Sequence, residues 1–204
     1  EYRTEKVLSK ICDLSLADYS CLDEFDDINA LFITAGFGHL KFFQELSEEY
    51  IQNSFSVNAV APIQIIRHYY DRLLASDHFY CGIMVSIAGR LSSPLFSVYS
   101  ATKAALSKFI EAVNVELDVQ GSKNRILEVS PGSMKGTGFT GGTSHPEMTV
   151  ALAEEIITRA EKHEELYIPQ YEDIFKGVME RYEADAHKYG VESYWYKKKR
   201  LEEQ

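Results

Sequence analysis

Short apolar runs alternate with longer amphipathic segments along this 204-residue chain. Runs that are apolar throughout and stop at Gly, Ser or Thr predict buried parallel strands, whereas apolar residues spaced three or four apart predict helices. The predicted strands cover residues 6–12, 29–33, 81–85, 125–129 and 166–168, and the predicted helices cover 16–25, 47–75, 97–119, 149–162 and segments from 172 onward. This alternation predicts an α/β fold with a doubly wound parallel sheet. A chain of this length is most simply a single domain.

Polar and glycine-rich positions refine this pattern. Ser47 is expected to cap the helix that follows it, because Glu48 and Glu49 place negative charge in the first turn. Pro62 predicts a bend within the same helix. Residues 133–145 are rich in Gly, Ser and Thr, which predicts a mobile loop of the kind that covers active sites. We therefore expect residues 133–163 to provide a substrate-binding loop and helix.

The pair Tyr99 and Lys103 carries the most informative chemistry in the chain. On the predicted helix 97–119 the two side chains are four residues apart and share one face. An ammonium group beside a phenol stabilises the phenolate and is expected to lower the tyrosine pKa toward neutral pH. Ser86 directly follows a predicted buried strand, so its hydroxyl is expected at the carboxyl end of the sheet, where open α/β sheets bind ligands. Together these groups predict proton transfer to or from a carbonyl oxygen.

Composition and charge exclude several classes of function. The 21 basic and 31 acidic residues give a formal net charge of −10, which argues against nucleic acid or an anionic membrane as the main partner. The basic run 197–200 is followed by two glutamates and is expected to be a solvated tail. No apolar run approaches the roughly 18 residues that span a bilayer.

Cysteines and histidines point to a reduced, metal-free protein. Cys12, Cys21 and Cys81 are odd in number and widely spaced, which is typical of free thiols in a cytosolic protein. The six histidines are scattered, and none has metal-ligand spacing to a partner. We therefore expect a cytoplasmic protein.

Several motifs in order resemble the short-chain dehydrogenase/reductase family, over residues 7–168. Ser86, Tyr99 and Lys103 match three catalytic positions of that family, and Asn58 matches the helix asparagine that supports a water-linked proton relay. The resemblance implies a Rossmann-like fold and hydride transfer between NAD or NADP and a small-molecule alcohol or carbonyl substrate. Tyr99 would transfer the proton and Ser86 would orient the substrate oxygen. It also implies a homodimer or homotetramer built on the helices that carry Asn58 and Tyr99.

The same resemblance implies a set of cofactor contacts. Asp13 and Leu14 match the adenine-contacting position, Thr34-Ala35-Gly36 resembles the family's Asn-Asn-Ala-Gly turn, and Pro131-Gly132 matches the turn beside the nicotinamide. The expected cofactor-binding residues are Asp13, Leu14, Thr34, Ala35, Gly36, Tyr99, Lys103, Pro131, Gly132 and Thr137.

Two departures from the family pattern change the expectations. Gly136 stands where the family usually has a threonine, so the adjacent Thr137 is expected to deliver the hydroxyl. The glycine-rich Thr-Gly-x-x-x-Gly-x-Gly loop that grips the cofactor pyrophosphate does not occur in the 204 residues. The given sequence begins about where the family's third strand begins, and we expect it to be part of a longer protein.

Plainer readings stay open for the individual residues. Asn58 is compatible with a solvent-facing position, Ser86 with a strand cap, Lys103 with a surface lysine, and Gly36 and Gly38 with turn geometry alone. Asp13 is compatible with capping the next helix. Phe37, His39, Leu91, Phe96, Met134 and Phe139 are candidates for an apolar substrate pocket or for ordinary packing.

Three alternatives stay open for the whole chain. An inactive relative of the same fold would sense a cofactor or act as a scaffold, because a fold does not establish activity. Epimerisation or dehydration of a nucleotide sugar is a related chemistry. The stretch 194–196 is compatible with packing on a neighbouring subunit, with closing over substrate or with burial in its own domain.

Overall fold

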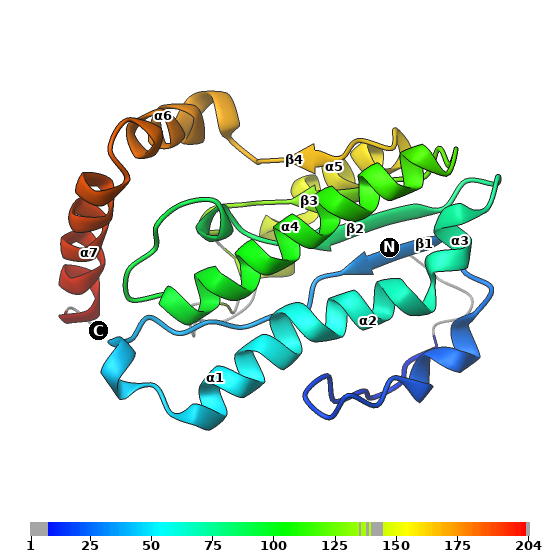
Figure 1. Ribbon diagram of the computed structural model, residues 1–204, viewed down its shortest axis with the longest axis horizontal. Coiled ribbons are helices and arrows are strands. Elements are labelled where there is room, and N and C mark those ends of the chain that lie inside the picture. The colour runs from blue at the N-terminus through cyan, green and yellow to red at the C-terminus, as the bar shows by residue number, and fades with distance from the viewer. Residues whose placement is uncertain (1–7, 135, 138, 140–144, 203–204) are drawn as a thin grey trace.

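The computed structural model describes residues 8–134, 136–137, 139 and 145–202, and its centre is a four-stranded parallel sheet. The strands are β1 (Ala30–Ile33), β2 (Tyr80–Met84), β3 (Ile126–Val129) and β4 (Leu166–Tyr167), and they pair in that order. In the register of the central pair, Cys81 lies opposite Ile126 and Met84 opposite Val129. The predicted α/β fold with a parallel sheet is confirmed (Figure 1).

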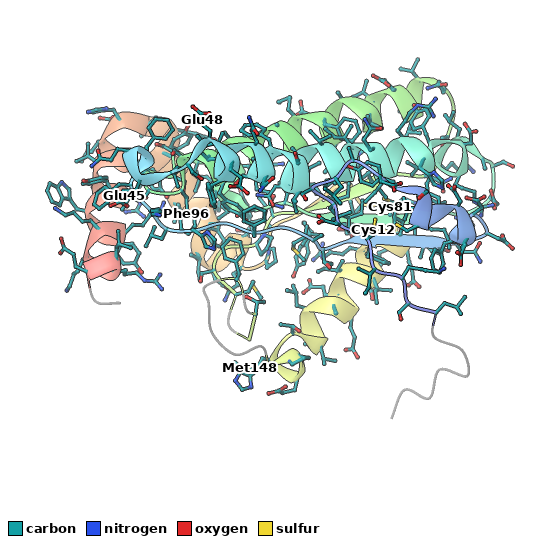
Figure 2. All side chains as sticks on the ribbon, turned by 90° about the horizontal axis from the view of Figure 1, so that it is seen from below. Cys12, Glu45, Glu48, Cys81, Phe96 and Met148 are labelled. Atoms are coloured by element: carbon teal, nitrogen blue, oxygen red, sulfur yellow. The ribbon has the colours of Figure 1, made fainter. Side chains whose placement is uncertain are left out.

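Helices cover both faces of the sheet. One face carries α1 (Glu48–Phe55), α2 (Ala61–His68), α3 (Tyr70–Leu74) and the long α4 (Ser97–Val119), whereas α5 (Val150–Glu161) contacts β2 and β3 from the other side (Figures 1 and 2). The helices α6 (Lys176–Ala184) and α7 (Ala186–Glu202) lie beyond the carboxyl ends of the strands (Figure 1). This arrangement places α7 at the same end of the molecule as the start of α4.

The core divides into two layers by the alternation of side chains along the strands. Along β3, Ile126 joins the larger core under α4, while Leu127 and Val129 pack with Ile156 of α5. Successive strand residues point to opposite faces, so the intervening Glu128 points to the α4 face. The α4 residues of the larger core follow helical spacing, and they are Leu106, Ile110, Val113 and Leu117.

The amino-terminal predictions need correction. Residues 8–12 form no strand, and residues 6–7 of that prediction lie outside the described residues. Within 16–25 only Ser20–Phe25 is helical, and it is a 3₁₀ helix. Leu14, Tyr19 and Leu22 pack against the larger core instead. A strand needs a ladder partner, and the described part of the chain pairs β1 only with β2.

The strand at 29–33 is present but less buried than predicted. Only Ile33 is buried, and the side chain of Phe32 keeps 37% of its exposure. The cause is position rather than sequence, because β1 is an edge strand of the sheet that the structure describes.

The predicted helix 47–75 is broken into segments. Ser47 caps α1 as predicted, its hydroxyl accepting a hydrogen bond from the Tyr50 N–H at 3.1 Å. The bend predicted at Pro62 lies just before that residue, where Ser56–Val60 form a π-helical turn. A second break in the helix lies at Tyr69. By contrast, α4 has the predicted bounds and is followed by Gly121, whose φ is +80°.

Candidate active site

The end of β2 supplies the first group of the site. Two residues beyond the strand, Ser86 caps the short 3₁₀ helix Ile87–Gly89, and its hydroxyl accepts a hydrogen bond from the Ala88 N–H at 3.1 Å. Ser86 thus caps this short helix rather than the strand before it, and the cap is compatible with a role in the site. Its side chain is 8% exposed and lies at the carboxyl edge of the sheet.

The first turns of α4 supply the second and third groups. Tyr99 and Lys103 share one face, and Lys103 Nζ lies 5.9 Å from the centre of the Tyr99 ring. The ammonium donates a hydrogen bond of 2.8 Å to the Met84 carbonyl at the end of β2. Because Lys103 is only 3% exposed, the surface-lysine reading is excluded. The Ser86 side chain lies close enough to the phenol of Tyr99 to lower its pKa, so the three predicted groups lie together.

Close backbone contact fixes α4 against the segment after β2. The Ser100 hydroxyl donates to the Ala88 carbonyl at 2.5 Å. A Cβ on Gly89 would lie 2.7 Å from the Lys103 carbonyl carbon, so only glycine allows this approach. Close main-chain packing thus contributes to holding the segment of Ser86 against the helix of Tyr99.

Asn58 lies on the π-helical turn and is fully buried, which excludes the solvent-facing reading. Its amide nitrogen donates to the Phe37 carbonyl at 2.8 Å and to the Thr102 hydroxyl at 3.3 Å, and its oxygen accepts from the Phe37 N–H at 2.9 Å. Inserted π turns recur at functional sites because they redirect a side chain. Here the turn aims Asn58 at the loop after β1.

The loop after β1 brings the glycine turn to the same place. A Cβ on Gly36 would lie 3.2 Å from both Asn58 Oδ1 and Lys103 Nζ, so this exposed glycine borders both buried groups. Gly38 packs closely against the ring of Tyr99, because a Cβ there would lie 2.7 Å from Tyr99 Cδ2. Thr34 is exposed and Ala35 half-buried at the start of the turn.

An aromatic enclosure surrounds the phenol. The rings of Phe139 and Phe96 lie 5.1 Å and 5.7 Å from the Tyr99 ring, measured between centres. Burial raises the pKa of Tyr99, and the hydrogen bond with Ser86 opposes that rise. Burial likewise lowers the pKa of Lys103 to about 8. The expectation that Lys103 lowers the Tyr99 pKa is therefore not met, because desolvation of the phenolate dominates.

The turn after β3 joins the site through the main chain. The Ile87 N–H donates to the Pro131 carbonyl at 3.0 Å, which ties this turn to the segment that begins at Ser86. Gly132 lies under the ring of Phe175, and a Cβ there would be 2.3 Å from that ring. Pro131 and Gly132 are thus brought to the site.

Three predicted cofactor contacts are not brought to it. The carboxylate of Asp13 is exposed and accepts hydrogen bonds from the N–H and the hydroxyl of Ser15, within a turn. It does not cap the next helix, Ser20–Phe25, whose N-cap is Tyr19. Leu14 packs on the core. Figure 2 shows Cys12, which precedes them in the chain, far from Phe96 along the length of the molecule. The hydroxyl of Thr137 donates to the Met134 carbonyl at 3.1 Å instead of pointing to the site.

The predicted substrate loop falls partly outside the described residues, namely at 135, 138 and 140–144. Of the candidate pocket residues, Phe96 and Phe139 contact Tyr99, whereas Leu91 packs into a separate apolar cluster. His39 stacks on Tyr50 beside a cavity of about 220 Å³. Sequence reasoning missed Tyr50, which bonds the His39 N–H, and Thr102, which bonds Asn58, because nothing local in the sequence signals contacts 11 and 44 positions away.

Within the part of the chain that the structure describes, no three His, Cys, Asp or Glu side chains are grouped to hold a metal ion. The helices of that same part include none with both the length and the apolar character needed to cross a bilayer.

Known proteins resemble the chain at moderate identity. An uncharacterized oxidoreductase of Saccharomyces cerevisiae is 30% identical over 121 residues, which cover 59% of this chain and 37% of the relative. The human epidermal retinol dehydrogenase 2 is 29% identical over 151 residues, which cover 71% of this chain and 49% of the relative. The chain thus spans less than half the length of these curated relatives.

Solved structures share the fold at lower identity. A short-chain dehydrogenase from Streptomyces avermitilis superposes with a TM-score of 0.61 at 19% identity, covering 88% of this chain and 75% of that one. An alcohol dehydrogenase from Thermococcus sibiricus complexed with 5-hydroxy-NADP superposes with a TM-score of 0.61 at 20% identity, covering 76% of this chain and 68% of that one. The family described as short chain dehydrogenase matches residues 15–147, well over half of the sequence. The chain therefore belongs to the short-chain dehydrogenase family.

Proposed function

We propose that the protein is a nicotinamide-dependent oxidoreductase that interconverts a small alcohol and its carbonyl compound, with Tyr99 as the general acid and base. One observation carries the proposal: the phenol of Tyr99 lies close enough to Ser86 for that hydroxyl to lower its pKa, and the Lys103 amine lies 5.9 Å from the centre of the Tyr99 ring at the carboxyl end of β2. A donor, an orienting hydroxyl and a cation at one point are what proton transfer to a carbonyl oxygen requires.

The raised pKa of Tyr99 favours the protonated phenol, which is the form that donates. In carbonyl reduction Tyr99 gives its proton to the substrate oxygen, and in alcohol oxidation it takes that proton back. Ser86 hydrogen-bonds the same oxygen and stabilises the charge that develops on it. The aromatic rings of Phe96 and Phe139 exclude water from the phenol.

The residues at this site fit NAD or NADP, as far as this chain provides them. Lys103 has three ammonium hydrogens, and the described residues account for one hydrogen bond, to Met84, so donors remain for ribose hydroxyls. In the Thr34-Ala35-Gly36 turn, the exposed Gly36 gives the ribose a backbone surface without a side chain beside that amine. Pro131 and Gly132 would hold the nicotinamide end. When bound, the nicotinamide supplies or accepts the hydride.

Asn58 stabilises this arrangement through its hydrogen bonds. Its hydrogen bonds with Phe37 and Thr102 join the loop after β1 to the helix that carries Tyr99 and Lys103. Both amide hydrogens are thereby used, so a water-linked relay to Lys103 would rely on the remaining acceptor capacity of the amide oxygen or on main-chain groups.

Replacing Tyr99 by Phe tests the proposal. Turnover of aldehydes and ketones with NADPH or NADH should fall by at least about 10²-fold, because a general acid typically contributes 10²–10⁴-fold. Cofactor affinity should change little. Tyr70→Phe is the matched control, since that phenol bonds Gln120 on a distant surface. Near-normal turnover in Tyr99→Phe would refute the assignment.

An inactive relative that senses cofactor or acts as a scaffold is the second candidate. It is favoured by the lack of a glycine-rich pyrophosphate loop in the 204 residues and by the Phe175 ring that covers Gly132. Quenching of protein fluorescence by NADPH separates the two, if it is measured on this chain and on a version with any residues encoded upstream of Glu1. Binding without turnover by the longer version would favour the sensor.

Assembly as a homodimer or homotetramer is also a proposal. Apolar side chains on the helices that carry the site are exposed, and they are Phe55, Val60, Val115 and Val119. Exposed apolar residues gathered on helix faces favour association between copies. Light scattering of the purified protein measures the mass, and a monomeric mass at micromolar concentration would contradict the proposal.

A further inference from the structure

A buried carboxylate with no part in the proposed chemistry lies on the central strand β3. Glu128 is 3% exposed, and its neighbours Leu127 and Val129 are fully apolar core residues. Burying a carboxylate costs several kcal/mol unless charge and hydrogen bonds compensate it. A central strand position of this kind would ordinarily be Val or Ile.

Four donor atoms satisfy the Glu128 carboxylate. Arg90 approaches Oε1 with Nε at 3.0 Å and with a terminal guanidinium nitrogen at 2.8 Å. The Ser130 hydroxyl donates to the same oxygen at 2.6 Å, and the Ser107 hydroxyl donates to Oε2 at 2.8 Å. The group is therefore an ion pair with two added hydrogen bonds, which is the geometry that makes a buried charge tolerable.

The donors come from the three segments that carry the proposed site. Arg90 directly follows the 3₁₀ helix that Ser86 caps. Ser107 lies one turn beyond Lys103 on α4, and Ser130 immediately precedes Pro131. A single carboxylate thus fastens the serine segment, the tyrosine helix and the glycine turn to one another.

We propose that Glu128 is a positioning residue, whose carboxylate fixes, through Arg90 and Ser107, the placement of the Ser86 hydroxyl against the Tyr99 phenol. It touches no reacting atom. Its effect arises because a displacement of about 1 Å between reacting groups can cost 10²-fold in rate. The kinetic part of this inference rests on the proposed function, whereas the geometric part does not.

The first experiment replaces Glu128 by Gln in the full chain. This change keeps the size of the side chain but removes the charge that holds Arg90. We expect kcat to fall by about 10- to 100-fold with the KM for the cofactor within about twofold, because the cofactor contacts are on other residues. Glu165→Gln is the control: it breaks an ion pair with Arg125 remote from the site and should leave kcat unchanged. An unchanged kcat in Glu128→Gln would overturn the inference.

The second experiment separates positioning from simple stability. In the double variant Arg90→Met with Glu128→Leu, apolar side chains replace both charges, and such replacements often keep or raise stability. We expect this variant to fold with an unfolding midpoint near that of the parent and yet to keep the low kcat. Recovery of the parental kcat would show that the pair acts only through stability and would overturn the inference.

The third experiment needs no turnover. Tyrosine labelled with ¹³C at Cζ reports the titration of Tyr99, assigned by its loss in Tyr99→Phe. The hydrogen bond with Ser86 lowers the Tyr99 pKa, so Ser86→Ala should raise it, and Glu128→Gln should raise it in the same direction. A parental Tyr99 titration in Glu128→Gln would overturn the inference. A shifted titration in a protein that reduces no carbonyl compound would sustain the positioning and refute the proposed activity.

Discussion

Asn58 and Phe37 exchange two hydrogen bonds: the amide nitrogen donates to the Phe37 carbonyl at 2.8 Å, and the amide oxygen accepts from the Phe37 N–H at 2.9 Å. This side chain thus mimics a strand partner for a loop residue 21 positions away. The exchange holds the turn after β1 against Lys103, because Gly36 borders both Asn58 and the amine. The Asn58 side chain thereby holds the loop after β1 next to Lys103 on α4.

Substituting Asn58 by Ala should destabilise the fold by about 1–3 kcal/mol, because the part-buried N–H and C=O of Phe37 lose their partners. Urea unfolding followed by circular dichroism measures the change. Gln52→Ala on the exposed side of α1 is the control and should shift stability by less than about 0.5 kcal/mol. A loss as small as that of the control would show that the loop repairs its hydrogen bonds elsewhere.

Substituting Gly38 by Ala should disturb the phenol of Tyr99 directly. The new methyl group would lie 2.7 Å from ring atom Cδ2, so the ring or the loop must move, at a cost of about 1–3 kcal/mol. We expect turnover to fall while cofactor affinity is retained. Gly177→Ala is the contrast, since no atom lies within 4 Å of a Cβ on that helical glycine. It should leave turnover unchanged and stabilise α6 slightly.

Substituting Lys103 by Met should abolish turnover and yet stabilise the protein at pH 7. Burial lowers the pKa of Lys103 to about 8. At pH 7 the folded protein therefore holds a protonated amine whose burial costs free energy of folding. The gain should be on the order of 1–3 kcal/mol, reduced by the lost hydrogen bond to Met84. Denaturant titration at pH 7 measures it, with the exposed Lys108→Met as control.

The sign of the pH dependence provides a second readout for Lys103. Between pH 8 and about 10.5 the unfolded chain retains a proton that the folded state has lost, so parental stability should rise with pH over this interval. The Lys103→Met variant should lack that rise. An equal slope in both proteins would contradict the buried position of the amine.

The paired histidines His78 and His163 should make the fold sensitive to mild acid. Their ring nitrogens lie 3.0 Å apart, and the pKa of His163 is lowered by burial, by His78 and by Arg125. As pH falls through about 6.5, the unfolded chain takes up a proton that the folded state resists, so stability should decrease.

Thermal unfolding between pH 7.5 and 5 measures this loss. His163→Asn should reduce the slope, and asparagine tolerates the positive φ of +55° at that position. His187→Asn, on the exposed surface of α7, should leave the slope unchanged. A slope that survives in the His163 variant would assign the acid sensitivity to other groups.

Local signals predicted the elements that carry the chemistry. The helix of Tyr99 and Lys103 was predictable because its apolar residues keep helical spacing from Ser97 to Val119. Ser86 was predictable because an uninterrupted apolar run stops just before it. The convergence of these groups followed from the rule that parallel strands end at one edge.

Contacts between distant segments were beyond such signals. The burial of Asn58 depends on a π-helical turn that no residue in Ser56–Val60 announces. Burial raises the pKa of Tyr99, and the rings that pack on it, Phe96 and Phe139, come from separate segments of the chain. This desolvation of the phenolate has a larger effect than the nearby amine of Lys103. The low burial of Phe32 depends on which strands neighbour β1, and that is a property of the sheet rather than of the strand.

The ladder of main-chain hydrogen bonds continues past the last residues of the strands. Val85 N–H donates to the Val129 carbonyl at 2.7 Å, Ile87 N–H to the Pro131 carbonyl at 3.0 Å, and Ser130 N–H to the Tyr167 carbonyl at 2.8 Å. Part of the support for the rim that bears the reactive side chains therefore comes from groups common to every amino acid. Rim side chains outside the proposed chemistry and the Glu128 network can therefore be exchanged during evolution or in the laboratory, so new substrate preferences can arise on an unaltered frame.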